Sequence, residues 1–84
     1  PWAPVHFLLI PKLHIPSFAQ LGPEHLTLMG HMMTMAPKLA LQEGCNPYPK
    51  GGFRIVSNTG QEGGQEVQHL HVHVMGGPRP WLRG

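Results

Sequence analysis

The stretch His69-Leu70-His71-Val72-His73-Val74-Met75 decides how the rest of the chain is interpreted. Imidazole and apolar side chains alternate along it, and alternate side chains of a β-strand point to opposite faces of a sheet. A strand here places one leucine and two valines on a core face and His69, His71 and His73 on the other. Neighbouring imidazoles on that face lie about 6.5–7 Å apart, which is two residue rises.

A row of three histidines has one structural and two chemical interpretations. The structural one is a solvent-facing side of an amphipathic strand, which Lys, Thr or Glu would serve equally well. The second is a metal site, because His-x-His on a strand is a good ligand spacing and neutral imidazole is a common zinc ligand. The third is nucleophilic catalysis, because imidazole can bond covalently to a phosphoryl group while its neighbours orient it. The histidines alone leave the metal and nucleophile interpretations open.

A glycine-rich segment, Asn58 to Gln65, precedes the histidines. Gly60, Gly63 and Gly64 predict a turn with a flexible backbone. The N–H groups of residues 63–66 can point at a phosphate, as anion-binding nests do. An ordinary glycine-rich hairpin has the same composition, but a phosphate-binding turn beside the histidines favours the nucleophilic interpretation.

The remaining pattern predicts further strands and one principal helix. The apolar run Val5–Ile10, bounded by prolines, is typical of a buried strand. Phe53–Ser57 predicts a second strand, and the histidine strand is expected to run from Glu66 or Val67 to Met75. The helix is expected from Pro23 to about Leu41, because proline suits the first helical position.

Apolar residues recur along this helix at helical spacing, which predicts a core-facing stripe that is wide enough to be buried on two sides. Pro37 removes one backbone hydrogen bond and is expected to kink the last turn or end the helix early. Gly44 is the expected C-terminal stop. The stripe consists of Leu26, Met29, Met33, Ala36 and Ala40, widened by Leu28, Met32 and Met35.

Length and composition narrow the class of protein. At 84 residues the chain is one domain, residues 1–84, and its 11 glycines and 10 prolines predict many turns. Charged residues make up only 12%, so part of the surface is expected to be covered by a partner. The net charge of +2 comes without a cluster of Lys or Arg, so neither nucleic acid nor a membrane is an expected partner.

Two further observations concern the chain's context. A single cysteine, Cys45, cannot form an internal disulfide, and nothing indicates export, so a cytoplasmic location is expected. The chain runs from Pro1 straight into the first predicted strand with no Met. We therefore expect that the beginning of the natural chain is missing from this sequence.

The histidine strand followed by Gly76-Gly77 resembles the histidine triad family of nucleotide-binding proteins. The segment Ala3–Lys12 is similar to the family's central strand, and Asn58 with Gly63–Val67 is similar to its phosphate loop. The resemblance covers essentially the whole chain in order and spacing. It implies an α+β fold with a mainly antiparallel sheet and one principal helix, whose N-terminal strands are missing from this sequence. The two glycines after the triad are closer to the purine nucleoside phosphoramidase branch than to the dinucleoside polyphosphate hydrolase branch.

The resemblance implies a role for each matching residue. His71 matches the nucleophile, and His69 matches the histidine that supports its geometry. His73 matches a phosphate-contacting histidine, and His6 a further histidine near the triad. The phosphate-binding groups that the resemblance implies are Asn58, Gly64, Gln65, Glu66 and His73.

The reaction that the resemblance implies is hydrolysis of nucleoside 5′-phosphoramidates or acyl-nucleotides at the α-phosphorus through a nucleotidyl-histidine. It requires no metal and no cofactor. The expected partners are purine nucleotides, as AMP or GMP derivatives, and a second copy of the chain in a two-fold dimer with joined sheets. The alternative is a nucleotide-binding or protein-interaction module with little turnover.

Two positions bear on the leaving group. Some family members have a hydroxyl residue where this chain has Glu66, which leaves leaving-group preference open while the backbone N–H is retained. The family's C-terminal tail reaches toward the active site of the neighbouring subunit. Trp81 is therefore either a simple packing residue or a residue that shapes the leaving-group side.

Overall fold

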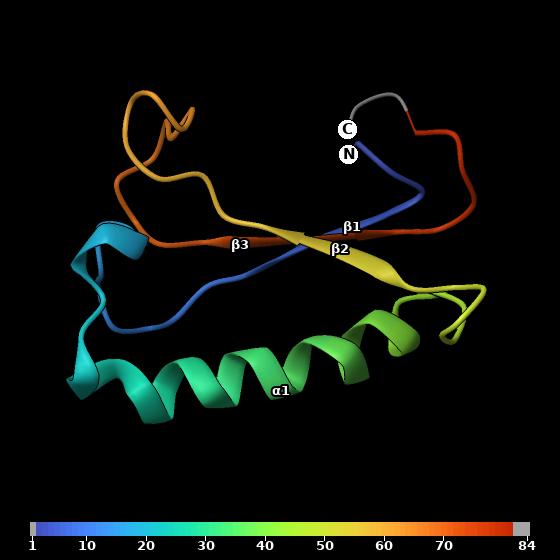
Figure 1. Cartoon of the computed structure of the whole chain (residues 1–84), viewed down its shortest axis with the longest axis horizontal. Coiled ribbons are helices and arrows are strands. Elements are labelled where there is room, and N and C mark those ends of the chain that lie inside the picture. Colours follow the sequence, from blue (N-terminus) through green and yellow to red (C-terminus); the bar gives the residue numbers. More distant parts are fainter. Residues whose placement is uncertain (1, 82–84) are drawn as a thin grey trace.

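The computed structural model describes residues 2–81 and confirms the α+β class. One long helix, α1 (Leu26–Gln42), lies along an antiparallel sheet of three strands (Figure 1). The strands are β1 (Val5–Leu9), β2 (Phe53–Val56) and β3 (Val72–Gly76), in the spatial order β1-β3-β2. The strand that carries the last histidine of the triad is thus the central one, hydrogen-bonded on both edges.

The register of β3 fixes which side chains share a face. His73 lies opposite Leu8 of β1, and Met75 lies between His6 of β1 and Arg54 of β2. Directly opposed residues of an antiparallel pair point to the same face. His6, His73 and Arg54 therefore share one face of the sheet, although they are far apart in the sequence.

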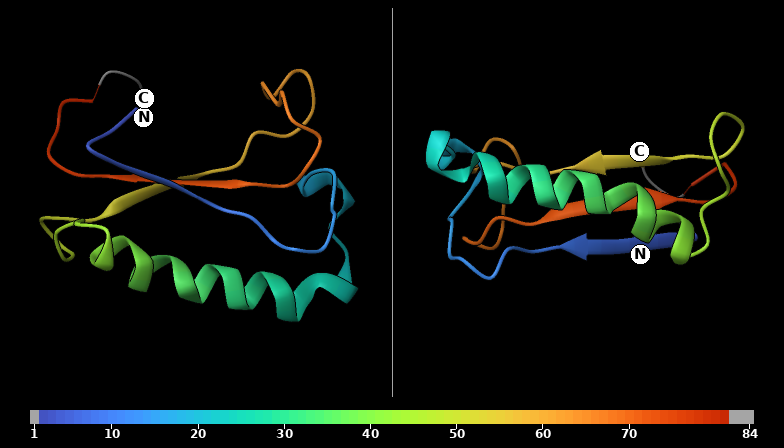
Figure 2. Two further views of the ribbon diagram at one scale, coloured as in Figure 1. Left: turned by 180° about the vertical axis from the view of Figure 1, so that it is seen from behind. Right: turned by 90° about the horizontal axis from the view of Figure 1, so that it is seen from below.

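The helix covers the other face of the sheet (Figure 2). Val74 is fully buried there with Ala40 of α1 and Cys45, and the β1 side chains of Val5, Phe7 and Leu9 pack against this cluster. In contrast, the glycine-rich loop and the segment after β3 lie on the side away from α1 (Figure 1). One face of the sheet is thus core, and the other carries the histidines together with the buried Met75.

The predicted start of the histidine strand is wrong. β3 begins at Val72, five or six residues later than expected, and residues 67–69 form a bend. The Leu70 N–H donates to the Ile15 carbonyl (2.6 Å), a partner outside the sheet. The alternation itself is confirmed, because Leu70, Val72 and Val74 are almost completely buried while the three histidines are half-buried.

The helix also differs from its prediction. Pro23–His25 forms a 3₁₀ turn before α1, and Pro37 does not end the helix, which continues to Gln42. The expected stop is confirmed by the φ of +111° at Gly44, which a side chain would disfavour.

The buried stripe of α1 is narrower than the one predicted. Its buried residues, Met32, Ala36 and Ala40, recur every fourth position and so form one line. Leu26 is 77% exposed and Leu41 is 55% exposed, so the chain by itself buries the helix on one side only. In the part of the chain that the structure describes, no helix is long and apolar enough to cross a membrane.

Candidate active site

Three of the predicted histidines meet on the open face of the sheet. His73 Nδ1 lies 2.9 Å from His6 Nε2, and the rings of His71 and His73 have centroids 5.2 Å apart. The indole of Trp2 is stacked on His73, with centroids 5.5 Å apart and planes 9° from parallel. The fold therefore brings His6, 65 residues before His71 in the sequence, into one cluster with it.

A backbone N–H group fixes the proton positions on His6 and His73. The Trp2 N–H donates to His6 Nδ1 (3.1 Å), so a neutral His6 carries its proton on Nε2. That Nε2–H donates to His73 Nδ1, which leaves the His73 proton on Nε2. His73 thus presents an N–H donor on its outer edge.

His71 has the opposite tautomer. Its Nδ1 lies 2.8 Å from the backbone carbonyl of His69, and a carbonyl oxygen can only accept, so Nδ1 carries the proton. The lone pair is therefore on Nε2. The hydroxyl of Ser57 donates to the His71 carbonyl (2.8 Å) and holds this residue's backbone. The result is a nucleophilic nitrogen beside a hydrogen-bond donor.

Burial keeps two of these rings uncharged. Burial lowers the pKa of His73, and the neighbouring rings of His6 and His71 lower it further. Burial also lowers the pKa of His6. Both rings are therefore neutral at pH 7, as the hydrogen-bonded chain of tautomers requires.

The side chain of His69 points away from the cluster. Its Nε2–H donates to the Pro11 carbonyl (3.0 Å), and its Nδ1 faces His14 Nδ1 at 3.4 Å. The contact between His69 and His71 is made by the His69 backbone carbonyl. His69 therefore meets His71 through its main chain, while its ring anchors the bend before β3.

A cavity of about 220 Å³ joins the histidines to the glycine-rich loop. It brings together most of the predicted site residues, although Asn58 and His73 are 15 positions apart in the sequence. A cavity of this size has room for a phosphate group. The lining residues are Trp2, Asn58, Gly64, Gln65, Glu66, Val67, His71 and His73.

The side chain of Gln65 holds the loop together. Its Oε1 accepts from the Gly60 N–H (2.9 Å), and its Nε2 donates to the carbonyls of Pro16 (2.7 Å) and Val67 (2.9 Å). Both hydrogens of the amide are therefore used. Gln65 shapes the loop from within, a role that its sequence position did not indicate.

The backbone donors of the loop fall into two groups. The N–H groups of Gly64 and Gln65 donate to the carbonyls of Gln61 (3.0 Å) and Gly60 (2.9 Å). Within residues 2–81, no hydrogen bond is made by the N–H of Glu66 or by the side-chain amide of Asn58. These two groups line the cavity and are free to contact an anion.

Two adjacent glycines are needed for different reasons. Gly64 has a φ of +82°, a conformation that L side chains rarely adopt. A Cβ on Gly63 would collide with the Thr59 carbonyl. The compact turn that points the loop at the histidines therefore depends on both.

Two groups in the site were not predicted. Trp2 and Ser57 carry no motif, and only the three-dimensional structure brings them to His73 and His71. Among residues 2–81, no three His, Cys, Asp or Glu side chains are grouped so that they could hold a metal ion. The arrangement provides a free imidazole nitrogen, a neighbouring N–H donor and uncommitted amides, which together suit attack on a phosphorus atom.

Known proteins are similar to this chain over most of its length. A family model described as "HIT domain" matches residues 1–79. Protein HitA of Neisseria gonorrhoeae is 50% identical over 78 residues, which are 93% of this chain and 69% of that protein. The purine nucleoside phosphoramidase of Escherichia coli (strain K12) is 44% identical over 77 residues, 92% of this chain and 62% of that protein.

Solved structures show the same fold. A HIT family hydrolase from Legionella pneumophila Philadelphia 1 superposes with a TM-score of 0.85 at 39% identity, over 94% of this chain and 68% of that one. A histidine triad protein from Clostridium difficile gives a TM-score of 0.82 at 35% identity, over 95% and 67%. The chain thus spans between 62% and 69% of the length of these four relatives.

Proposed function

The chain belongs to the HIT domain family, and on this premise we propose that it hydrolyses nucleoside 5′-phosphoramidates or acyl-nucleotides with His71 as the nucleophile. The observation that carries the proposal is the hydrogen bond from His71 Nδ1 to the His69 carbonyl, which leaves the lone pair on Nε2. The name of the E. coli relative, purine nucleoside phosphoramidase, supports the substrate class.

The first step forms a bond between His71 Nε2 and the α-phosphorus. The bond from phosphorus to the leaving nitrogen or acyl oxygen breaks, and the leaving group departs with that electron pair; a leaving amine also takes a proton from water. The nucleotide stays on His71, whose Nδ1–H is held by the His69 carbonyl. The carbonyl dipole stabilises the positive charge that this ring gains.

The second step returns the enzyme to its starting state. Water bonds to the phosphorus, the bond to His71 Nε2 breaks, and the nitrogen recovers its lone pair while the water's proton passes to solvent. The product is a nucleoside monophosphate. Each step spreads negative charge over the phosphate oxygens, and fixed donors must stabilise that charge.

The stabilising donors in the proposal are neutral groups. His73 offers Nε2–H, because its Nδ1 accepts from His6. The Asn58 amide and the Glu66 N–H line the same cavity, and neither makes a hydrogen bond within residues 2–81. Direct contacts of Gly64 and Gln65 with the phosphate remain part of the proposal and require their N–H groups to leave partners within the loop.

We also propose that the protein acts as a dimer of two copies. β2 lies at the edge of the sheet, and its Phe53 and Ile55 are 40% and 41% exposed. An edge strand with exposed apolar side chains is a template for pairing with a second strand. Joining two sheets through β2 also suits the one-sided burial of α1.

The test of the proposed function is AMP release from adenosine 5′-phosphoramidate by the purified protein. The proposal expects catalytic release of AMP that a chelator does not reduce. Tight binding of AMP without release would identify a nucleotide-binding module instead. Loss of activity in chelator that added zinc restores would instead identify the metal site that the histidine spacing left open.

A further inference from the structure

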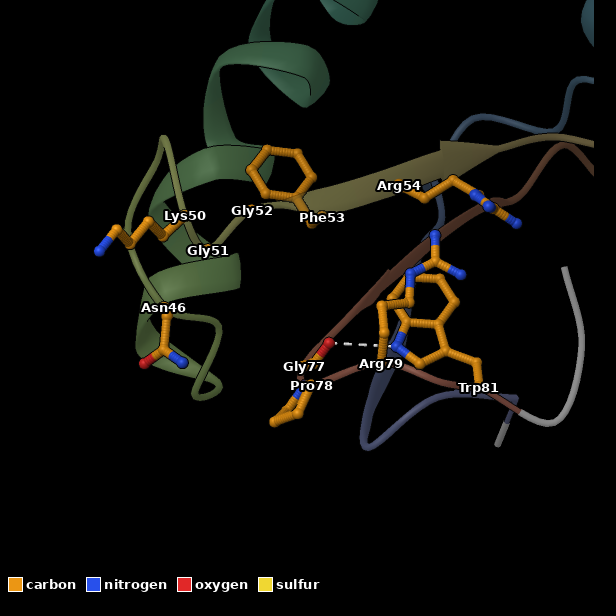
Figure 3. Close-up of a pocket in the computed structure, with 10 residues that line it drawn as sticks. All are labelled: Asn46, Lys50, Gly51, Gly52, Phe53, Arg54, Gly77, Pro78, Arg79 and Trp81. Atoms are coloured by element: carbon orange, nitrogen blue, oxygen red, sulfur yellow. Dashed lines mark hydrogen bonds between the residues drawn. The ribbon is translucent and has the colours of Figure 1, made fainter.

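A second cavity, of about 470 Å³, lies where β2 begins and β3 ends, outside the site described above (Figure 3). It is lined by Arg54 of β2 and by Arg79 and Trp81 of the segment that follows β3. The two arginines are 25 positions apart, so the sequence shows no basic cluster here. The fold creates one.

Both guanidinium groups lie against the same indole. The Arg79 guanidinium carbon is 3.8 Å from the centroid of the Trp81 ring, and that of Arg54 is 5.3 Å away. The Trp81 Nε1–H donates to the Gly77 carbonyl (3.1 Å), so the ring is held in place (Figure 3). The figure also shows Lys50, which lines the same cavity, pointing away from the indole.

The two positive charges have no negative partner. No Asp or Glu lines the cavity, and within residues 2–81 neither guanidinium makes a hydrogen bond or an ion pair. Cation–π contact uses the face of a guanidinium, so the N–H donors at its edge remain available. Two like charges beside one ring also repel each other, and an anion between them removes that repulsion.

We propose that Arg54, Arg79 and Trp81 form a binding subsite for an oxyanion, a carboxylate or phosphoryl group. Guanidinium edges match the oxygen spacing of both groups. Met75, which is 2% exposed, lies between Arg54 and His6 on this face of the sheet and separates the subsite from the histidines.

Binding is tested on ¹⁵N-labelled protein titrated separately with acetate and inorganic phosphate, following the Arg Nε–H and Trp81 indole signals. We expect saturable shifts at these signals, and the tighter of the two ions identifies the group. R54Q and R79Q should each weaken binding about fivefold, the loss of one charge-assisted contact at a partly exposed site.

The matched control is K38Q, which removes the same charge from α1, away from the cavity. It should leave the titration unchanged. If K38Q weakened anion binding as much as R54Q and R79Q do, the weakening would be due to net charge alone, and the proposed subsite would be wrong. Absence of saturable shifts in the unaltered protein would overturn it as well.

Discussion

The two faces of β3 are built from neighbouring residues and are held by different forces. Val72 and Val74 face α1 and are buried by packing, which depends on shape and volume and on no particular atom. His71 and His73 face the other way, and a hydrogen bond to each ring decides which nitrogen holds the proton. At these four positions stability therefore belongs to the valines and chemistry to the histidines, and a change at one pair should leave the other pair's property intact.

The largest effect should come from His71→Ala on the open face. Without the Nε2 lone pair no nucleotidyl intermediate forms, and kcat should fall at least about a thousandfold. The free energy of unfolding should change little, because this ring is only half-buried. Steady-state AMP release and urea unfolding measure the two properties.

The control for that variant is His31→Ala, on an exposed position of α1. It should retain full activity. If His71→Ala kept normal rates of AMP release, the assignment of His71 as the nucleophile would be wrong.

Val74→Ala makes the complementary change on the core face. Removing two methyl groups from a fully buried side chain should lower the free energy of unfolding by about 2 kcal/mol. The kcat of the folded protein should remain within a factor of two or so, since no atom of the site is altered. Ile10→Ala, at a position 55% exposed, should cost about 0.5 kcal/mol or less. A large fall in the kcat of Val74→Ala, measured under conditions where this variant is fully folded, would show that packing on the core face affects the site.

His6→Phe should have an intermediate effect on activity alone. It removes the donor to His73 Nδ1, so His73 is no longer held in the tautomer that presents Nε2–H. We expect kcat to fall about tenfold, the loss of one oriented hydrogen bond. His6→Gln keeps an N–H donor and should recover most of the rate, and ¹⁵N shifts of His73 report the tautomer directly. A packing role alone would predict no such recovery.

The smallest effect is the pH dependence of stability. Burial lowers the pKa of His6 and His73 in the folded protein, so the unfolded chain binds protons more readily. Stability should therefore be constant above the unfolded value of about 6.5 and fall as the pH drops through and below it. The melting temperature followed from pH 7.5 to about 5 should decline less in His6→Gln than in the unaltered protein. An equal decline in the two proteins would contradict the lowered pKa of His6.

The sequence predicts the elements whose signal is local. The alternation at residues 69–75 correctly separates buried from half-buried side chains, because each residue's face follows from its neighbours. The predicted start of β3 is wrong because the chain bends at residues 67–69, next to a long-range hydrogen bond from the Leu70 N–H to the Ile15 carbonyl. The buried line of α1 is narrower than its apolar pattern, since a sheet of three short strands covers only one side.

The site shows the same limit. The resemblance named His6, His71 and His73, and the fold brings them together. The tautomers depend on backbone groups of Trp2 and His69, which no side-chain pattern encodes. The meeting of Arg54 and Arg79 on one indole depends on the path of the chain after β3 and has no local signal either.

The most direct test of the account is to trap the intermediate. The protein is mixed with adenosine 5′-phosphoramidate, quenched within one turnover and digested, and the peptides are weighed by mass spectrometry. We predict an added adenylyl group on the peptide that holds residues 69–75, attached to His71. An adenylyl group on any other residue, or none during confirmed turnover, would contradict the assignment of the free Nε2 lone pair as the nucleophile.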